Sequence, residues 1–278
     1  MQIIDGKSLA QEIKNNIKEE IKRLGSKPGL ATILIGSDPA SHLYVKLKQR
    51  ACDEVGIHNE VYLYFATTEE ETIINQIKKL NKRDDIHGIL IQLPLPEHLD
   101  GDKIIKNIDP QKDVDGFHPE NIQKFLSGKS YIIPGLALGI LKLIESTKEK
   151  LDDKKAVILC NSDIFAAPIE KILRDKNITT EHTHPENLKL TEKTKSADIL
   201  IVAVGRPNFI DKNMVKNGAI IIDVGTNRTE EGVVGDVDFA SVKDMDGFIT
   251  PVPGGVGPMT VAMLLYNTLE IAKRFIKN

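Results

Sequence analysis

The sequence has little of what a disulfide-stabilised, secreted or membrane-spanning protein would carry. Its 278 residues include no tryptophan and two cysteines, Cys52 and Cys160. Two cysteines in a chain of this length form no disulfide framework, and they suit a reducing, cytoplasmic setting. No apolar run reaches the roughly 18 residues that a membrane helix needs, and the first residues show no signal-peptide pattern. We therefore expect a cytoplasmic protein with no membrane partner.

An excess of basic residues is also missing. The formal net charge is -3 at pH 7, whereas a nucleic-acid-binding domain usually carries a basic stripe. We therefore expect a small-molecule ligand and no nucleic-acid partner. The composition, with 41% hydrophobic and 28% charged residues, is that of a globular protein. The length allows a buried core without a disulfide or metal to stabilise it.

Helix-like and strand-like segments alternate along the chain. In the first part, helices are predicted at 8–24, 41–55 and 69–81, and strands at 30–35, 61–65 and 88–93. In the second part, strands are predicted at 156–159, 178–180, 199–203 and 219–223, and helices at 138–150, 168–175, about 212–216 and 259–277. This alternation predicts an α/β fold with parallel sheets, and the second part is of the doubly wound kind that binds dinucleotides.

The segment 94–134 between the two parts is irregular and rich in Pro, Gly and Asp, which indicates a domain boundary near it. We expect two domains. The first comprises residues 1–120 together with the C-terminal helix 258–278. The second is a Rossmann-like domain of residues 121–257, which is entered through a linker helix at about 138–150.

Tyr44 and Lys48 are four residues apart on a predicted helix and therefore share one face. A lysine held near a phenol and away from water can have its pKa lowered toward neutrality, so that it moves protons at pH 7. The spacing alone equally fits a surface lysine on an amphipathic helix.

Polar residues also stand at two other informative places. Gln92 ends a very apolar strand, where open α/β sheets place their ligands, although it could simply cap backbone groups. Asp115 could bind an aminopyrimidine-type ring through two hydrogen bonds, or it could form an Asx turn before Gly116. A loop rich in Pro and Gly at 249–260 precedes the last helix, where free N–H groups could hold a ligand; a rigid turn is the alternative.

Six runs of residues, in order along nearly the whole chain, belong together. They are YVKLK at 44–48, GILIQLPLP at 88–96, KDVDGFHP at 112–119, ADIL at 197–200, GDVDF at 235–239 and TPVPGGVGPMT at 250–260. Together they closely resemble the bifunctional methylenetetrahydrofolate dehydrogenase/methenyltetrahydrofolate cyclohydrolase family. That family oxidises 5,10-methylenetetrahydrofolate with NADP and hydrolyses the methenyl product to 10-formyltetrahydrofolate at the same site.

The resemblance implies roles for the residues that match. Lys48 would be the main acid/base group of the hydrolysis, Tyr44 would orient the folate and Lys48, and Gln92 would hydrogen-bond Lys48. Asp115 would hold the pterin ring. The folate pocket would be lined by Pro251, Gly254, Gly255 and Gly257. The resemblance further implies a cytoplasmic homodimer that serves purine and formyl-methionine supply, with NADP as cofactor and no metal.

The sequence departs from the family where the dinucleotide would bind. Cys160, Asn161 and Ser162 stand where the family commonly has Gly-Arg-Ser, and 165–168 (FAAP) stands for Val-Gly-x-Pro. Residues 134–137 (PGLA) replace Pro-Cys-Thr-Pro, and Thr226 replaces Ile. Lost glycines hinder close backbone approach to a pyrophosphate, although Ser162 and a helix start near Pro168 could still meet it.

Glu181 lies at the end of the second predicted strand of this domain, about 20 residues after the first turn. An acid there usually binds the ribose 2′-hydroxyl of NAD and repels the 2′-phosphate of NADP, although a solvent-exposed strand end is the alternative. His182 and His184 could offset its charge when protonated. The predicted cofactor-binding residues are Cys160, Asn161, Ser162, Glu181 and Thr226. NADP is implied by the resemblance, and NAD by Glu181 and the missing Arg.

Three functions are consistent with these observations to different degrees. The leading one is the bifunctional enzyme. The second is a cyclohydrolase with weak or lost dehydrogenase activity, because the departures cluster on the dinucleotide side. A non-catalytic folate-binding protein is disfavoured, because Tyr44, Lys48 and Gln92 are all present.

Overall fold

The computed structural model describes residues 1–230 and 232–277, and the chain forms two compact units. Unit 1 comprises Met1–Ala10 and Leu136–Thr260, and unit 2 comprises Gln11–Gly135 and the residues from Val261 onward. Each unit contains its own parallel sheet. The two-part α/β fold is as the alternation of segments predicts.

The limits of the units differ from the predicted domain limits by three residues at 258–260, which lie in unit 1, and by longer segments at two other places. Residues Met1–Ala10 join unit 1, because strand β1 (Gln2–Ile3) pairs in parallel with β11 (Phe248–Ile249). Residues 121–135 join unit 2, where the side chain of Asn267 donates a hydrogen bond to the Ile133 carbonyl at 2.9 Å. Both differences come from contacts between residues more than 100 positions apart, which local patterns do not reveal.

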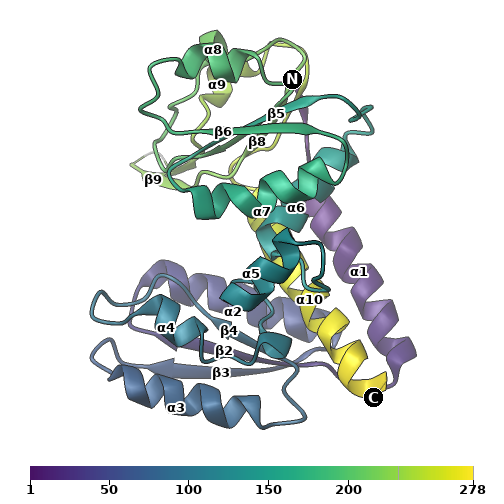
Figure 1. Cartoon of the computed structure of the whole chain (residues 1–278), viewed down its shortest axis with the longest axis vertical. Coiled ribbons are helices and arrows are strands. Elements are labelled where there is room, and N and C mark those ends of the chain that lie inside the picture. Colours follow the sequence, from purple (N-terminus) through teal and green to yellow (C-terminus); the bar gives the residue numbers. More distant parts are fainter. Residues whose placement is uncertain (231, 278) are drawn as a thin grey trace. The chain divides into compact units, whose positions relative to one another are not determined.

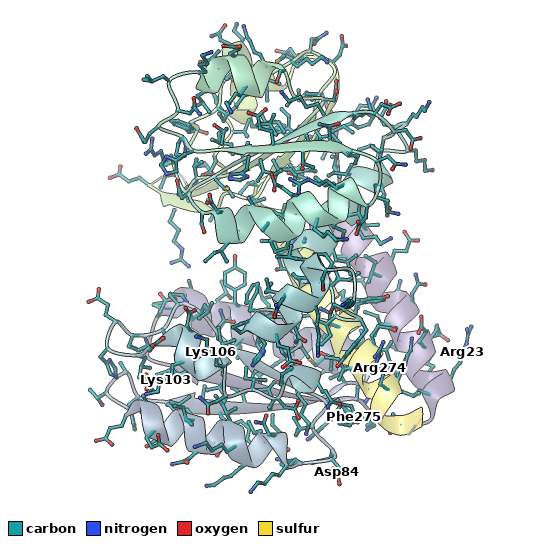
Figure 2. All side chains as sticks on the ribbon, in the orientation of Figure 1. Arg23, Asp84, Lys103, Lys106, Arg274 and Phe275 are labelled. Atoms are coloured by element: carbon teal, nitrogen blue, oxygen red, sulfur yellow. The ribbon has the colours of Figure 1, made fainter. Side chains whose placement is uncertain are left out.

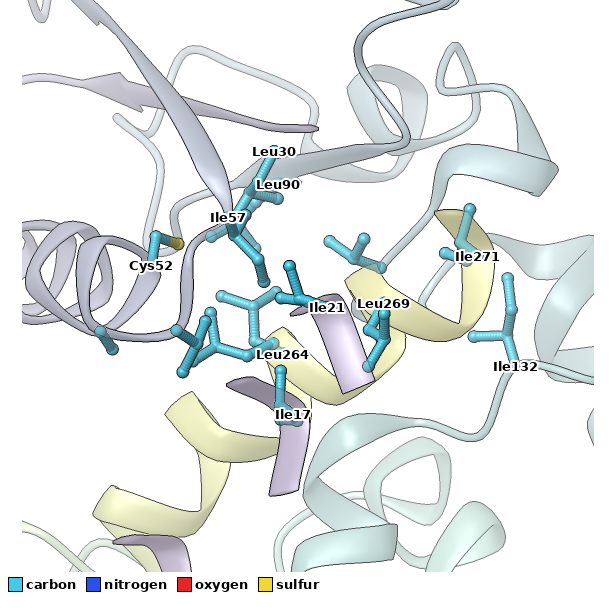
Figure 3. Close-up of a cluster of buried hydrophobic side chains, with 14 residues drawn as sticks. Ile17, Ile21, Leu30, Cys52, Ile57, Leu90, Ile132, Leu264, Leu269 and Ile271 are labelled. Carbon is cyan, nitrogen blue, oxygen red and sulfur yellow. The ribbon is translucent and has the colours of Figure 1, made fainter. Parts of the chain in front are cut away.

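The sheet of unit 2 has the strand order β3-β2-β4, with β3 at His58–Tyr64, β2 at Gly29–Ile35 and β4 at Gly88–Ile91. Successive side chains of a strand point to opposite faces. On β2, Leu30 therefore packs with the helices α1 (Gly6–Leu24), α2 (Pro39–Val55) and α10 (Val256–Lys277), as the core in Figure 3 shows. Ile33 faces α3 (Glu70–Asn81) on the other side, and Figure 1 shows α2 and α3 on opposite faces.

Short helices occupy part of the segment that the sequence predicts to be irregular. They are α4 (Gly101–Ile105), the 3-10 turn η1 (Pro110–Lys112) and α5 (Pro119–Leu126). Each begins at a capping side chain, which is Asp100, Asp109 or His118. Elements this short contain too few apolar repeats to show a helical period, so the sequence pattern missed them.

The end of α10 is held on unit 2 by an aromatic cluster. Phe275, labelled with Arg274 in Figure 2, meets the ring of His87 edge-on at 5.8 Å between centroids. The buried Lys112 lies 5.6 Å from the same ring and donates to the Arg83 carbonyl at 2.6 Å, beyond the end of α3. These contacts join segments that are distant in the sequence.

The sheet of unit 1 has the order β1-β11-β8-β7-β5-β6. Its longer strands are β8 (Ile220–Asp223), β7 (Ile199–Ala203) and β5 (Lys155–Cys160), followed by β6 (Thr179–Thr183) at the edge. Figure 1 shows α7 (Asp163–Arg174) and α8 (Leu190–Lys195) on opposite faces of this sheet. The remaining elements of the unit are α6 (Gly135–Ser146), η2 (Lys212–Met214), the antiparallel pair β9 (Asn227–Thr229) and β10 (Gly232–Val234), and α9 (Phe239–Val242).

Two predicted helices of unit 1 are corrected. The helix predicted at 168–175 begins at Asp163, with Ser162 as its N-cap and Pro168 in its interior. It continues through the proline because its face with Ile169, Ile172 and Leu173 is buried. The helix predicted at about 212–216 is a 3-10 turn of three residues. Within the described residues, none of the helices has the length and apolar character to cross a membrane.

Candidate active site

Lys48 and Gln92 meet through a direct hydrogen bond in unit 2. The Lys48 Nζ donates to Gln92 Oε1 at 2.9 Å. Gln92 follows β4 directly and is 8% exposed. Its own Nε2 donates to the Leu93 carbonyl at 2.7 Å, which fixes the amide with its oxygen toward the lysine. The geometry thus joins a helical lysine to a strand end 44 residues away.

The surroundings of Lys48 favour its neutral form. Burial lowers the pKa of the Lys48 ammonium, while the Asp115 carboxylate opposes that shift. A buried ammonium loses the water that stabilises its charge, so it gives up its proton more readily than an exposed lysine does. A half-buried lysine with a lowered pKa and a fixed partner can act as a proton acceptor.

Asp115 lies near Lys48 and is also perturbed. Burial raises the pKa of Asp115 to about 6; Lys48 opposes this shift and Asp113 adds to it. The Asp115 side chain lines a small cavity of about 10 Å³ together with Asp113, Phe117 and isoleucines that follow or belong to β4 and α4. A cavity of this size has room for about one water molecule.

The loop that carries Asp115 is fixed by two residues to which the sequence analysis assigns no role. Asp113 is buried and accepts hydrogen bonds from the Gly116 N–H at 3.1 Å and the His118 N–H at 2.8 Å. Asn267 of α10 donates to the Val114 carbonyl at 2.9 Å. An asparagine directly after the apolar run 261–266 is the available signal, because a buried amide needs partners. Hydrogen bonds on both sides of Asp115 therefore hold its loop in place.

Tyr44 lies one turn before Lys48 on α2. The tyrosine is 36% exposed, so its ring borders solvent next to the Lys48 site. The helix itself begins at Asp38, whose carboxylate accepts the Ser41 N–H at 2.7 Å. The i, i+4 arrangement predicted from the sequence is present.

The Pro-Gly loop belongs to unit 1, whereas the residues described above belong to unit 2. Gly254 has a φ of +112°, which side chains rarely adopt, and a Cβ on Gly255 would lie 2.7 Å from the Pro251 carbonyl oxygen. Both glycines are therefore needed to fold the loop back on itself. Gly257 is different: it lies inside α10, and its Cβ position faces open space.

The carboxyl edge of the unit 1 sheet contains the switch point of a doubly wound fold. The chain runs from β5 outward to β6 and then returns to β7 on the other side of β5. Ligands bind at such a switch point, beyond the carboxyl ends of the strands. Here the Asn161 side chain, just after β5, donates to the Val204 carbonyl, just after β7, at 3.0 Å. Asn161 thus bridges the two strand ends.

Two buried aspartates hold the backbone at this edge of the sheet by accepting hydrogen bonds from its N–H groups. Asp236 accepts hydrogen bonds from the N–H groups of Val204 at 2.6 Å, Gly205 at 3.0 Å and Arg206 at 2.9 Å. Asp223 accepts the N–H of Gly225 at 2.9 Å, and burial raises the pKa of Asp223 to about 6. The sequence analysis included Asp236 in a family motif but gave neither aspartate a role.

Glu181 lies elsewhere than the sequence predicts. Strand β6 continues to Thr183, so Glu181 is in mid-strand, paired in register with Val157. Its carboxylate contacts the ammonium groups of Lys193 and, at 3.1 Å, Lys155, and these lysines lower its pKa. The expectation that Glu181 ends the strand is therefore wrong, because ladder pairing with β5 extends β6 beyond the residues with strong strand preference.

The histidines near Glu181 do not offset its negative charge. His182 points to the α7 side, where its ring contacts Glu170 at 3.0 Å and Asp163 at 3.2 Å. His184 follows the strand and is exposed. The neighbours of Glu181 that carry positive charge are the two lysines.

Some side chains at the carboxyl edge of the unit 1 sheet fit a bound nucleotide. The Thr183 hydroxyl at the carboxyl end of β6 is buried and has no hydrogen-bond partner within the described part of the chain. Ser162 caps α7 by position but makes no side-chain cap bond. The first turn of a helix offers N–H groups to anions, although Asp163 places an acid there. Cys160 ends β5 and is buried, and Thr226 follows β8 and is exposed.

Among residues 1–230 and 232–277, no set of three or more His, Cys, Asp or Glu side chains is arranged to hold a metal ion.

Two family models match the chain. The tetrahydrofolate dehydrogenase/cyclohydrolase catalytic domain matches residues 4–115, and the NAD(P)-binding domain of the same family matches residues 134–276. The chain belongs to this family. The match confirms the resemblance, the fold class and an NAD(P)-binding domain.

Individual relatives agree over their full length. The "Bifunctional protein FolD" of Nautilia profundicola is 47% identical over 100% of this chain and 99% of the relative. The bifunctional FolD structure from Campylobacter jejuni is 43% identical with a TM-score of 0.95, covering 99% of both chains. The Trypanosoma brucei enzyme, solved with NADP and an inhibitor, is 32% identical with a TM-score of 0.94, covering 99% of this chain and 98% of its own.

Proposed function

We propose that this chain oxidises 5,10-methylenetetrahydrofolate to the methenyl form with NADP and hydrolyses the methenyl form to 10-formyltetrahydrofolate. The observation that carries the proposal is the hydrogen bond of 2.9 Å between Lys48 and Gln92. It occurs in a chain that matches bifunctional relatives over its full length.

The hydrolysis needs a proton acceptor next to an electron-poor carbon. The Lys48 amine takes a proton from water as the water oxygen bonds to the methenyl carbon. The added hydroxyl then loses its proton and becomes the formyl carbonyl as the bond from that carbon to N5 of the folate breaks, and N5 receives a proton. Because burial lowers the pKa of Lys48, its amine is free to act nearer neutral pH. Gln92 keeps the amine in one orientation.

The other proposed site residues bind and orient the folate. Asp115 accepts hydrogen bonds from the pterin ring, and Tyr44 positions the ring system over Lys48. Pro251, Gly254, Gly255 and Gly257 line the folate pocket, although Gly257 stands within a helix. Bound NADP would supply the hydride acceptor, and the protein contributes alignment of the two reactants.

Unit 2 is proposed as the folate-binding catalytic domain and unit 1 as the nucleotide-binding domain. Cys160, Asn161, Ser162 and Thr226 are proposed to border the nucleotide, because they follow strands at the carboxyl edge of the unit 1 sheet. The active protein is proposed to be a cytoplasmic homodimer that supplies formyl groups for purine synthesis.

NADP is proposed over NAD because the charge of Glu181 is already compensated. An acid that contacts two lysines repels a 2′-phosphate far less than an isolated one. NAD remains the second candidate, since Asn161 supplies no positive charge where the family commonly has Arg.

A cyclohydrolase with weak or lost dehydrogenase activity is the alternative function. It is favoured by the acid in the first turn of α7 and by the side chains that replace glycines after β5. Both would hinder a pyrophosphate at this helix end.

Steady-state rates of the purified protein distinguish these functions. We expect methenyl hydrolysis, and methylene oxidation that is faster with NADP than with NAD. Hydrolysis without oxidation by either nucleotide would support the alternative. Absence of both reactions would contradict the proposal.

A further inference from the structure

An exposed ion pair crosses the nucleotide edge of unit 1. Arg206 comes three residues after β7, and Glu186 comes three residues after β6. The guanidinium of Arg206 contacts the carboxylate of Glu186. Strands β6 and β7 flank β5 on its two sides, so this pair lies at the carboxyl ends of the strands around the switch point.

The backbone of Arg206 is held in place, whereas the partner of its guanidinium can be exchanged. The Arg206 N–H is bound at 2.9 Å by Asp236, which is fully buried. The guanidinium also lies 5.2 Å from the centre of the Phe209 ring, a cation–π contact. The ion pair itself is exposed, with side chains 46% and 64% accessible, and exposed pairs contribute little stability. An anionic ligand can therefore displace Glu186 without disturbing the loop.

The residues named above in this unit do not supply an uncompensated positive charge for a phosphate. Asn161 is neutral and is engaged with the Val204 carbonyl. Lys155, at the amino end of β5, and Lys193 contact Glu181 in mid-strand. The buried Thr183 hydroxyl, without a partner in the described part of the chain, adds an uncharged donor at the end of β6. Arg206 has the charge and the fork of donors that bind a phosphate bidentately.

We propose that Arg206 is the specificity-determining residue that binds the 2′-phosphate of NADP, and that the phosphate replaces Glu186 as its partner. This inference rests on the proposed function, of which it names the cofactor contact. The positive charge then comes from the loop after β7, because Asn161 after β5 carries none.

Direct binding of nucleotide fragments tests the inference. Calorimetric titration of the full chain with 2′,5′-ADP and with 5′-AMP compares ligands that differ in the 2′-phosphate. For Arg206→Gln we expect 2′,5′-ADP binding to weaken about 10-fold or more, with 5′-AMP binding unchanged, since one charge-assisted bidentate contact is lost. Arg206→Lys should be intermediate. Glu186→Gln should tighten 2′,5′-ADP binding about 2- to 5-fold by removing the competing carboxylate.

The control is Arg228→Gln, which removes an exposed arginine of the same unit in β9 and should change neither ligand's affinity. The inference is overturned if Arg206→Gln weakens both ligands equally or neither, or if the unmodified protein does not prefer 2′,5′-ADP. Methenyl hydrolysis in the same preparations reports on the proposed function separately. Its loss in the unmodified protein contradicts that function, and its retention with failed discrimination overturns the Arg206 assignment alone.

Discussion

The Lys48 site of unit 2 and the nucleotide edge of unit 1 differ in what their sequences keep. Lys48, Gln92 and Asp115, which are proposed to perform the chemistry, all lie within residues 4–115, the segment that matches the family's catalytic domain. At the nucleotide edge the first strand turn is rewritten, yet Asp223 and Asp236 hold the backbone by several hydrogen bonds each. A proton-transfer site depends on particular side chains, whereas a nucleotide edge depends first on backbone shape, so the second tolerates more substitution.

Methenyl hydrolysis is expected to require Lys48, whose loss should have the largest effect. We expect Lys48→Met to lower the methenyl hydrolysis rate by about 100-fold or more, the usual size of a lost acid/base group. The matched control is Lys46→Met on the same helix, an exposed lysine whose loss should leave the rate within about 2-fold. Equal rates for the Lys48 variant and the unmodified protein, measured by loss of methenyl absorbance, would remove Lys48 from the mechanism.

The importance of the backbone frame can be tested at Asp236. Asp236→Ala leaves the buried N–H of Val204 and the partly buried N–H of Gly205 without an acceptor, and a buried unsatisfied group costs about 1–3 kcal/mol. We expect a loss of unfolding free energy on the order of 3 kcal/mol in urea, with weaker nucleotide binding. Unchanged stability and binding would show that the frame does not depend on this carboxylate.

Gln92 is expected to orient Lys48 without carrying the proton itself. Gln92→Ala removes the acceptor that orients the lysine, and we expect hydrolysis to fall about 10-fold while Lys48 still carries the proton. Gln92→Glu restores an acceptor but adds a charge that favours protonated lysine, so its rate should fall most at neutral pH and recover at high pH. A rate that does not change in either variant would limit Gln92 to a structural role.

The pH dependence of folate binding tests Asp115. Because its pKa is raised to about 6, the carboxylate is ionised above that pH and protonated below it. A protonated acid no longer accepts both hydrogen bonds, so KM for the folate should rise about 5- to 10-fold between pH 7 and pH 5. In Asp115→Asn the profile should lose this step. A step that persists in the variant would belong to another group.

Glu181 should give the smallest effect. Since its carboxylate faces two lysines in mid-strand, Glu181→Gln should change KM for NAD by less than about 2-fold. A large increase in KM for NAD alone would restore Glu181 as a ribose ligand.

The same contrast explains what could be predicted from the sequence. The shared face of Tyr44 and Lys48 and the strand end at Gln92 follow from helix and strand periods, which are local properties. Glu181 was misplaced because the end of β6 is set by pairing with β5, which the composition of β6 does not show. Asn267 and Asp236 were missed as positioning residues because their partners are up to 153 residues away in the chain. Long-range hydrogen bonds leave no periodic pattern.

The ionisation of Lys48 decides whether this lysine can accept a proton from water. Lysine labelled with carbon-13 at the ε position can be titrated by NMR, and the Lys48 resonance can be assigned by its absence in Lys48→Met. Because burial outweighs the attraction of Asp115, the pKa of Lys48 should lie below the ordinary lysine value of 10.5. A Lys48 that titrates at or above that value would be a charged surface lysine at neutral pH, and the account of the hydrolysis would be wrong.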